Sequence, residues 1–114
     1  MKILFVEDNE EFQLCVVRDY LFDHEVDSAY DGSEGIKLFD HNFYDLVLLD
    51  YQMDQVHGPD VVSHIREVNK LIPVIAVSME DRLNEELLKL GATAALAKRH
   101  MTKLVQLIQE IVVE

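Results

Sequence analysis

The sequence predicts an α/β fold, a doubly wound parallel sheet of five strands with five flanking helices. Short apolar runs alternate with segments of helical period from one end of the chain to the other. Several of the runs are apolar throughout, which is typical of parallel strands covered on both faces. Right-handed crossovers are expected to join consecutive strands. No repeat, low-complexity segment or linker interrupts the alternation.

The predicted strands are runs of β-branched and other apolar residues. The first contains Ile3-Leu4-Phe5-Val6 and the third contains Leu46-Val47-Leu48-Leu49. Uninterrupted runs of this kind indicate strands in the interior of a sheet. The five predicted strands are Lys2–Val6, Val26–Tyr30, Leu46–Leu49, Val74–Val77 and Ala94–Ala97.

The segments between the strands have helical period. In the first of them, Phe12, Val16 and Tyr20 recur at the spacing of one helix face and form its core stripe. Pro59 suits the first turn of the third helix. Gly91 is expected to end the fourth. The five predicted helices are Glu10–Phe22, Ser33–Asp40, Pro59–Val68, Arg82–Leu90 and Thr102–Val113.

Composition limits the classes of function. The 114 residues are predicted to form one domain, 1–114, without a DNA-binding or enzymatic output segment. The net charge of −12 argues against direct binding to nucleic acid and favours protein partners. No apolar run approaches the roughly 20 residues of a membrane span, and we expect a cytoplasmic protein. The single cysteine, Cys15, is expected to face the core from the first helix, with no redox role.

Acidic residues follow two of the predicted strands directly. Glu7 and Asp8 come after the first strand and Asp50 after the third. The carboxyl ends of parallel strands lie at one edge of the sheet, where ligands bind, so these carboxylates are expected there. Ser78 and Lys98, after the fourth and fifth strands, are expected there too. Adjacent carboxylates need a cation or a proton, and oxygen ligands suit Mg²⁺.

These residues, in this order, resemble the response-regulator receiver domain, the phospho-acceptor module of two-component signalling. The resemblance covers essentially the whole chain and implies a flavodoxin-like sheet with strand order 2-1-3-4-5. It depends on Glu7-Asp8, the segment Asp-Leu-Val-Leu-Leu-Asp ending at Asp50, Met53, Gly58, Ser78 and Lys98.

The resemblance also implies a metal site. Asp8 and Asp50 would bind Mg²⁺ directly, with Mn²⁺ as a possible substitute. Gln52 would offer its backbone carbonyl, and Glu7 would act through water. The metal would neutralise charge, because a carboxylate that attacks a phosphoryl group must overcome repulsion between anions.

The resemblance further implies a phosphoryl site and its partners. Asp50 would take a phosphoryl group from a phosphohistidine, forming an acyl phosphate. Lys98 and the Ser78 hydroxyl would hold phosphoryl oxygens. The donor would be a sensor histidine kinase or a histidine phosphotransfer protein. The chain would promote only its own phosphorylation and dephosphorylation, and would not otherwise be an enzyme.

Five departures from the family pattern affect signalling. Ala95 stands where the family usually has Tyr or Phe, the ring that reports phosphorylation. Arg99 replaces a proline, so the preceding peptide bond is expected to be trans. Met79 stands where a small residue is usual and is expected to cover part of the acceptor. Asp54 adds negative charge near the metal, and the segment Ser78–Gly91 is about two residues shorter than usual.

Three functions therefore follow as hypotheses. The first is a receiver that signals by altered protein contacts through an atypical output switch. The second is a constitutive interaction module that keeps the fold without switching. The third, an aspartyl phosphatase, is disfavoured because Gln52 stands where a second carboxylate is needed. Leu14, Val17 and Leu21 form a second apolar line on the first helix, either a docking surface or buried.

Overall fold

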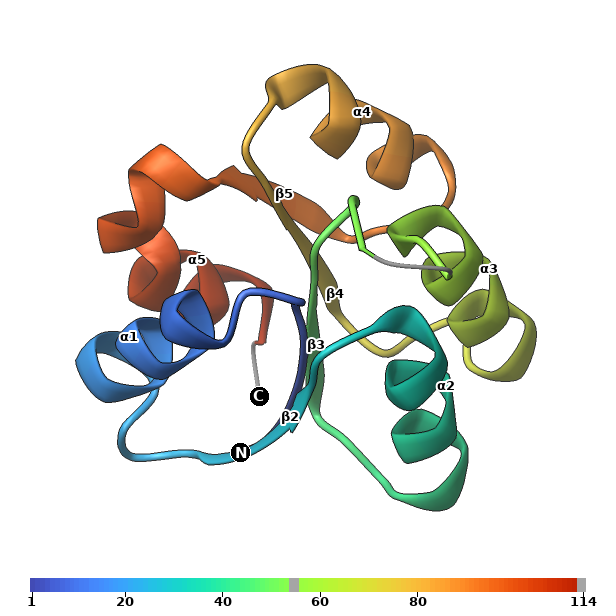
Figure 1. The fold of residues 1–114 in the computed structure, drawn as a ribbon, viewed down its shortest axis with the longest axis horizontal. Helices are drawn as coiled ribbons and strands as arrows, with labels where there is room; N and C mark the ends of the chain where they lie inside the picture. Colours follow the sequence, from blue (N-terminus) through green and yellow to red (C-terminus); the bar gives the residue numbers. More distant parts are fainter. Residues whose placement is uncertain (54–55, 113–114) are drawn as a thin grey trace.

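The sheet lies at the centre of the molecule, between two layers of helices (Figure 1). The computed structural model describes residues 1–53 and 56–112. Within those residues, no helix is long and apolar enough to cross a bilayer. The elements in chain order are β1 (Lys2–Val6), α1 (Glu10–Tyr20), β2 (Glu25–Ala29), α2 (Gly32–His41), β3 (Leu46–Leu49), α3 (Gly58–Val68), β4 (Val74–Ser78), α4 (Asp81–Lys89), β5 (Ala94–Ala97), the 3₁₀ helix η1 (Lys98–Lys103) and α5 (Leu104–Ile111).

The strands are all parallel and lie in the order β2-β1-β3-β4-β5, which confirms the predicted fold. Helices α1 and α5 cover one face of the sheet, and α2, α3 and α4 cover the other (Figure 1). The register aligns Val6, the last residue of β1, with Ala29 of β2 and Leu49 of β3. The residues that follow β1 and β3 therefore emerge side by side.

Apolar helix stripes bury the sheet from both sides. On one side Val61 and Ile65 of α3 pack against the strands, as their helical spacing requires. On the other side Val16 of α1 and Leu104 and Ile108 of α5 form the second core layer. Every residue of β3 and β4 is buried, which explains why their sequences are almost continuously apolar.

The predicted last helix begins later than expected. After β5 the chain makes η1, in which His100 has non-helical dihedral angles, and α5 starts at Leu104 rather than at Thr102. A 3₁₀ turn is tighter than an α-helical one and allows a sharper change of direction after the strand. The predicted end at Val113 lies outside the described residues. Helix α1 ends at Tyr20, two residues before the predicted end, where the Leu21 N–H donates to Val17.

The prediction that Cys15 faces the core is wrong, because Gln13 takes the buried position on α1. Cys15 is exposed, whereas Gln13 is 1% exposed. The Gln13 side-chain amide donates to the backbone oxygens of Phe5, Glu7 and Ala29, at 3.1, 3.0 and 2.9 Å. The amide therefore ties the carboxyl ends of β1 and β2 together, and the Ala29 oxygen also accepts from the Glu7 backbone N–H at 3.0 Å.

The second apolar line of α1 does not form one surface. Leu21 is fully buried, Val17 is half-buried, and Leu14 is 66% exposed. The line turns from solvent into the core along the helix, so only its first residue is available to a partner. Of the two alternatives, burial therefore describes Leu21 and part of Val17, and Leu14 alone is left for a docking contact.

Candidate functional site

Three carboxylates converge where β1 and β3 end. One ligand oxygen from each of Glu7, Asp8 and Asp50 lies within 4.8 Å of the others. Glu7 is fully buried and Asp50 is 6% exposed, whereas Asp8 is exposed. The carboxylates open into a hollow of about 310 Å³. The hollow is lined by Glu7, Asp8, Asn9, Asp50, Gln52, Met79, Leu83 and Lys98.

Both oxygens of the Asp50 carboxylate lie near a donor. Oδ1 accepts a hydrogen bond of 2.8 Å from the Tyr51 backbone N–H, and Oδ2 lies 3.5 Å from Lys98 Nζ. Burial raises the pKa of Asp50, and the nearby Lys98 ammonium opposes that rise. The carboxylate is thus held in place, and it is partly desolvated at the floor of an open hollow.

Glu7 is the most deeply buried of the three acids. Its Oε2 accepts from the Asn9 backbone N–H at 3.0 Å, and its Oε1 lies 2.6 Å from Lys98 Nζ. Burial raises its pKa to about 7, with repulsion from Asp50 adding to the rise and Lys98 opposing it. A carboxylic acid near neutrality gains from a divalent cation, which replaces the proton.

Lys98 enters the same site although the family's proline is absent. The side chain is 14% exposed, and Nζ also lies 4.7 Å from the centre of the Phe12 ring. The described residues contain no cis peptide bond, so the predicted trans bond before Arg99 is confirmed. The Arg99 guanidinium donates to Asp81 of α4 at 2.9 Å. Lys98 is therefore held over the acids by Glu7, Asp50 and Phe12, without the proline.

The remaining predicted residues lie around the hollow. Ser78 is fully buried at the end of β4, and its hydroxyl oxygen has no hydrogen-bond partner among the described residues. Gln52 is exposed and lines the hollow. Met79 also lines it, but the residue is 71% exposed, so it forms a rim and leaves the hollow open. Asp54 lies outside the described residues.

Two hollows meet at Ala95 on the edge strand β5. The residue is half-buried on β5, and two hollows of about 290 and 370 Å³ both reach it. Leu96 and Lys103 line both hollows as well.

Two contacts of the site were not predicted from the sequence. The spacing predicts Phe12 in the core stripe of α1, yet its ring also faces the Lys98 ammonium. Tyr51 received no role, although its backbone N–H holds Asp50. The position of Tyr51 directly after the acidic residue was the only available signal. For Phe12 the spacing indicated only a buried helix face.

The donor set of the cluster suits a hard divalent cation. Three carboxylates supply oxygen ligands, and the exposed Asp8 leaves room for water on the open side. Two of the acids are buried and share a single cation among the described residues, Lys98, so an added positive charge would relieve their repulsion. The residues present therefore fit Mg²⁺.

Mg²⁺ affinity is expected to rise with pH through neutrality. Glu7 must lose its proton to favour the ion, and with a pKa of about 7 its ionised fraction grows about tenfold between pH 6 and 8. Without metal, stability changes with pH in the opposite direction to Mg²⁺ affinity. The contribution of Glu7 to stability falls as pH rises from about 4.5 to 7, because its pKa is higher in the folded state. Calorimetric Mg²⁺ titration at pH 6, 7 and 8 tests this, and Glu7→Gln should flatten the dependence. An equally steep dependence in Glu7→Gln would contradict the assignment to Glu7.

Comparison with known proteins gives one family for the chain. The model of the response regulator receiver domain matches residues 3–109. An uncharacterized transcriptional regulatory protein of Bacillus subtilis, YcbL, is 44% identical over 63 residues, which are 55% of this chain and 27% of that protein. The transcriptional regulatory protein CiaR of Streptococcus pneumoniae is 32% identical over 87 residues, 75% of this chain and 38% of CiaR. The chain thus spans less than half the length of these relatives.

Solved structures share the fold over almost the whole chain. The response regulator TrrA of Thermotoga maritima, in complex with Mg²⁺ and BeF, has a TM-score of 0.89 at 25% identity and covers 97% of this chain and 98% of its own. The chemotaxis protein CheY4 of Vibrio cholerae has a TM-score of 0.87 at 24% identity, with the same coverage. With the family match over residues 3–109, the parallel sheet and the acidic cluster at its carboxyl edge, the chain belongs to the response regulator receiver domains of two-component systems.

Proposed function

We propose that residues 1–114 act as a single receiver domain that accepts a phosphoryl group on Asp50. Phosphorylation and Mg²⁺ binding are general features of the family. The observation that carries the proposal for this chain is the desolvated Asp50 carboxylate, held at the floor of an open hollow beside two further acids and Lys98. Departures from the family pattern leave this acid and lysine set intact.

The proposed metal ligands are Glu7, Asp8, Asp50 and the backbone carbonyl of Gln52, with Glu7 acting through water. Bound Mg²⁺, or Mn²⁺ in its place, would supply positive charge against the incoming phosphoryl oxygens. With the acids neutralised, Lys98 would no longer be needed by Glu7, its nearest acid at 2.6 Å, and its ammonium would be available to the phosphoryl group.

Asp50 provides the nucleophilic oxygen. The bond between that oxygen and phosphorus forms as the phosphorus–nitrogen bond of a phosphohistidine breaks, and the donor imidazole leaves. Lys98 holds one phosphoryl oxygen as a point charge. The buried Ser78 hydroxyl, without a partner among the described residues, donates to another.

The proposed donor is a sensor histidine kinase or a histidine phosphotransfer protein, in the cytoplasm. Receiver domains as a family are phosphorylated by sensor kinases, and one matching relative is the sensor kinase LuxN of Vibrio harveyi, 33% identical over 79 residues. We propose output through altered protein contacts, without the ring that Ala95 replaces. The transcriptional roles in the names of other relatives belong to those proteins.

Intact-mass measurement with a small phosphodonor tests the proposal. The chain is expected to gain one phosphoryl group in the presence of Mg²⁺ and none without a divalent ion. Asp50→Asn is the matched control, because it keeps the size of the side chain and removes the nucleophilic charge; it should gain nothing. Phosphorylation of Asp50→Asn, or none of the wild type despite bound Mg²⁺, would contradict the proposal.

A wild type that binds Mg²⁺ but is not phosphorylated would favour another function, a constitutive interaction module. Two observations support that alternative: Ala95 leaves the two hollows unfilled, and Arg99 of the trans-linked loop is paired with Asp81 of α4. Such a module would bind its partner equally well with and without the phosphodonor. A pull-down under both conditions separates the two functions.

A further inference from the structure

Tyr51 contacts three parts of the molecule at once. Its backbone N–H donates to Asp50 Oδ1 at 2.8 Å, and its carbonyl accepts from the Gly58 N–H, at the start of α3, at 2.8 Å. Its hydroxyl donates to Glu86 Oε2 of α4 at 2.5 Å. The residue is half-buried and packs against the core layer under α2 and α3. One residue therefore joins the acceptor, α3 and α4.

The exposed side of α4 is joined to the rest of the molecule through the hydrogen bond from Tyr51 to Glu86. The helix buries Leu83, Asn84 and Leu87 against the sheet, whereas Glu86 is exposed. Among the described residues, Tyr51 is the only hydrogen-bond partner of the Glu86 side chain. Beside the helix a surface hollow reaches Ala95, and the buried Asn84 Oδ1 has no hydrogen-bond partner among the described residues. The helix is therefore open to solvent along this hollow, and the Tyr51 hydrogen bond is a further contact that holds it.

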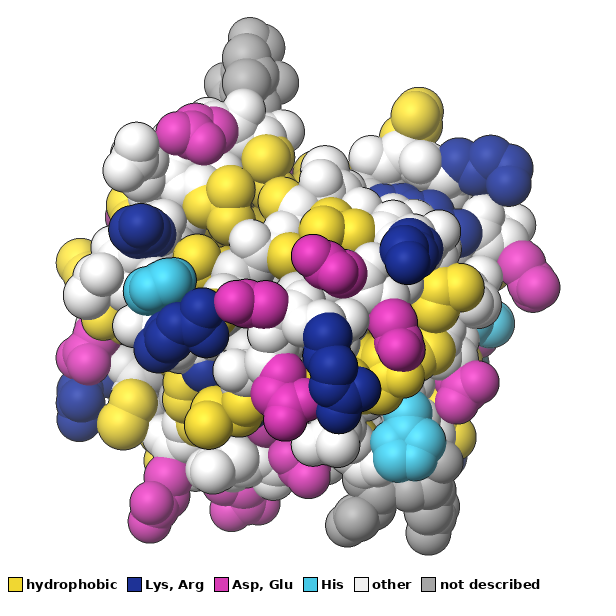
Figure 2. Space-filling view, turned by 90° about the horizontal axis from the view of Figure 1, so that it is seen from above, with side chains coloured by type: hydrophobic (Ala, Val, Ile, Leu, Met, Phe, Trp, Pro, Cys, Tyr) yellow, Lys and Arg dark blue, Asp and Glu magenta, His cyan; other side chains and the backbone are white. Residues whose placement is uncertain are grey.

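We propose that the Tyr51–Glu86 hydrogen bond is a tether that holds α4 in the resting state, and that occupation of the Asp50 site releases it. Tyr51 is then a positioning residue that carries the state of Asp50 to α4 in a chain without the usual aromatic residue at Ala95. The inference rests on the proposed function of Asp50. The surface that changes is α4, whose outer side carries charges of both signs among hydrophobic side chains (Figure 2).

The release of the tether on occupation of the site follows from the position of Asp50 Oδ1, the oxygen that contacts Tyr51. Asp50 Oδ1 accepts the Tyr51 N–H, so a rotation of this carboxylate toward a cation or a phosphoryl group moves or breaks that contact. The Tyr51 backbone then shifts, and its hydroxyl leaves Glu86. Coupling of this kind is reciprocal. If binding at the Asp50 site weakens the tether by some factor, the tether weakens binding at that site by the same factor.

Amide hydrogen exchange across Asp81–Lys89 tests the tether, with Mg²⁺ and beryllium fluoride as a probe that mimics the phosphoryl group. In the wild type, exchange in α4 should become about fivefold faster when the probe binds, the factor for one lost hydrogen bond. In Tyr51→Phe, α4 should exchange at this faster rate already without the probe and change little on adding it. Tyr51→Phe should also bind the probe up to about fivefold more tightly.

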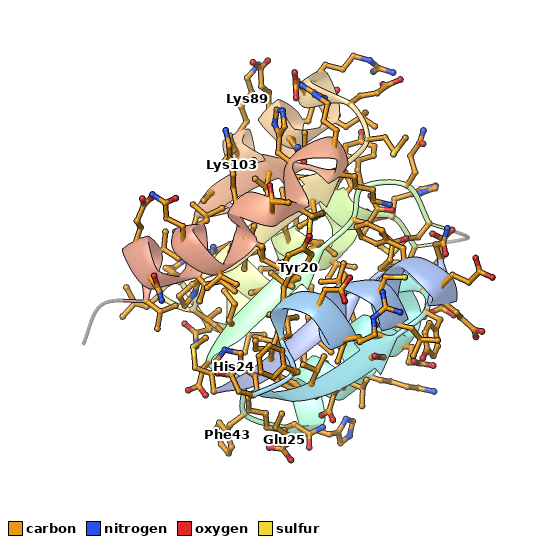
Figure 3. The ribbon with its side chains drawn as sticks, turned by 90° about the vertical axis from the view of Figure 1, so that its left-hand side faces the viewer. Tyr20, His24, Glu25, Phe43, Lys89 and Lys103 are labelled. Atoms are coloured by element: carbon orange, nitrogen blue, oxygen red, sulfur yellow. The ribbon has the colours of Figure 1, made fainter. Side chains whose placement is uncertain are left out.

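Two matched controls separate the tether from general destabilisation. Tyr44→Phe removes a hydroxyl with a similar carboxylate partner, Asp27 at 2.7 Å. Tyr44 follows Phe43, which lies at the end of the molecule remote from Lys89 of α4 (Figure 3). Glu86→Ala should reproduce Tyr51→Phe, and Glu85→Ala, its exposed neighbour on α4, should behave like the wild type.

The outcomes distinguish the tether from the function on which it depends. Suppose that the wild type binds the probe. Unchanged exchange of α4 in Tyr51→Phe, or an equal acceleration in Tyr44→Phe, would then overturn the tether but not the acceptor function. Probe binding that leaves α4 unchanged in the wild type would overturn the tether as well. A wild type that binds Mg²⁺ but not the probe would overturn both the proposed acceptor function and the tether.

Discussion

Replacing Lys98 by methionine is expected to slow phosphorylation of Asp50 by roughly 100- to 1000-fold, the cost of losing one preorganised electrostatic contact to the reacting group. Methionine keeps most of the aliphatic length that lies against Phe12 and removes the ammonium. The ammonium is the only cation within 4.0 Å of Glu7 and Asp50 among the described residues. Its loss leaves both acids facing the incoming phosphoryl group without that compensation.

The same variant changes stability in a pH-dependent way. Without Lys98 the rise of the Glu7 pKa is opposed only by the hydrogen bond from the Asn9 backbone N–H, so Glu7 is protonated over a wider range of pH. At a pH above that range both acids are charged and lack their cation. The free energy of unfolding should then fall by about 3 kcal/mol in metal-free buffer. Near pH 5 the loss should be smaller, because Glu7 is neutral.

Single-turnover phosphorylation and urea unfolding at pH 5 and 8 measure the two effects. Lys103→Met is the matched control, because Lys103 lies in the same η1 segment but is exposed at the surface (Figure 3). It should phosphorylate at the wild-type rate and unfold normally at both pH values. A Lys98→Met variant that phosphorylates within a few-fold of the wild type would contradict the role of this lysine.

The strands and the convergence of the acids were predictable because they depend on local pattern and on topology. Continuous apolar runs identify strands that are buried on both faces. Once the sheet is parallel, its strand ends share an edge, so Glu7 and Asp50 had to lie close together. The lysine after β5 joins them for the same reason, and the structure brings its Nζ to 2.6 Å from Glu7.

What could not be predicted depends on contacts between residues far apart in sequence. A glutamine in a helix is ordinarily exposed. Gln13 is buried instead of Cys15 because its amide reaches three backbone carbonyls at the ends of β1 and β2. The Tyr51–Glu86 pair spans 35 residues and requires the relative placement of the loop after β3 and of α4. Neither hydropathy nor spacing contains that information.

Replacing Gly58 by alanine is expected to destabilise the domain by about 3 kcal/mol and to disturb the acceptor directly. A Cβ at this position would lie 2.4 Å from the Asp50 carbonyl oxygen and 2.8 Å from the Tyr51 Cα. Both atoms are backbone, so no side-chain rotation can relieve the overlap. The first turn of α3 must move away from the loop, and the 2.8 Å hydrogen bond from the Gly58 N–H to the Tyr51 carbonyl must lengthen or break.

The displaced loop carries both Asp50 and Gln52, so Mg²⁺ affinity should fall together with stability. Thermal unfolding with and without Mg²⁺ measures both, and the stabilisation that Mg²⁺ confers on the wild type should shrink in Gly58→Ala. Ser63→Ala, at an exposed position of the same helix, should stay within about 0.5 kcal/mol of the wild type. Normal stability in Gly58→Ala would mean that α3 can retreat freely from β3, in which case the close approach of the two backbones is dispensable. Normal stability with reduced Mg²⁺ binding would instead locate the need for glycine in the acceptor site alone.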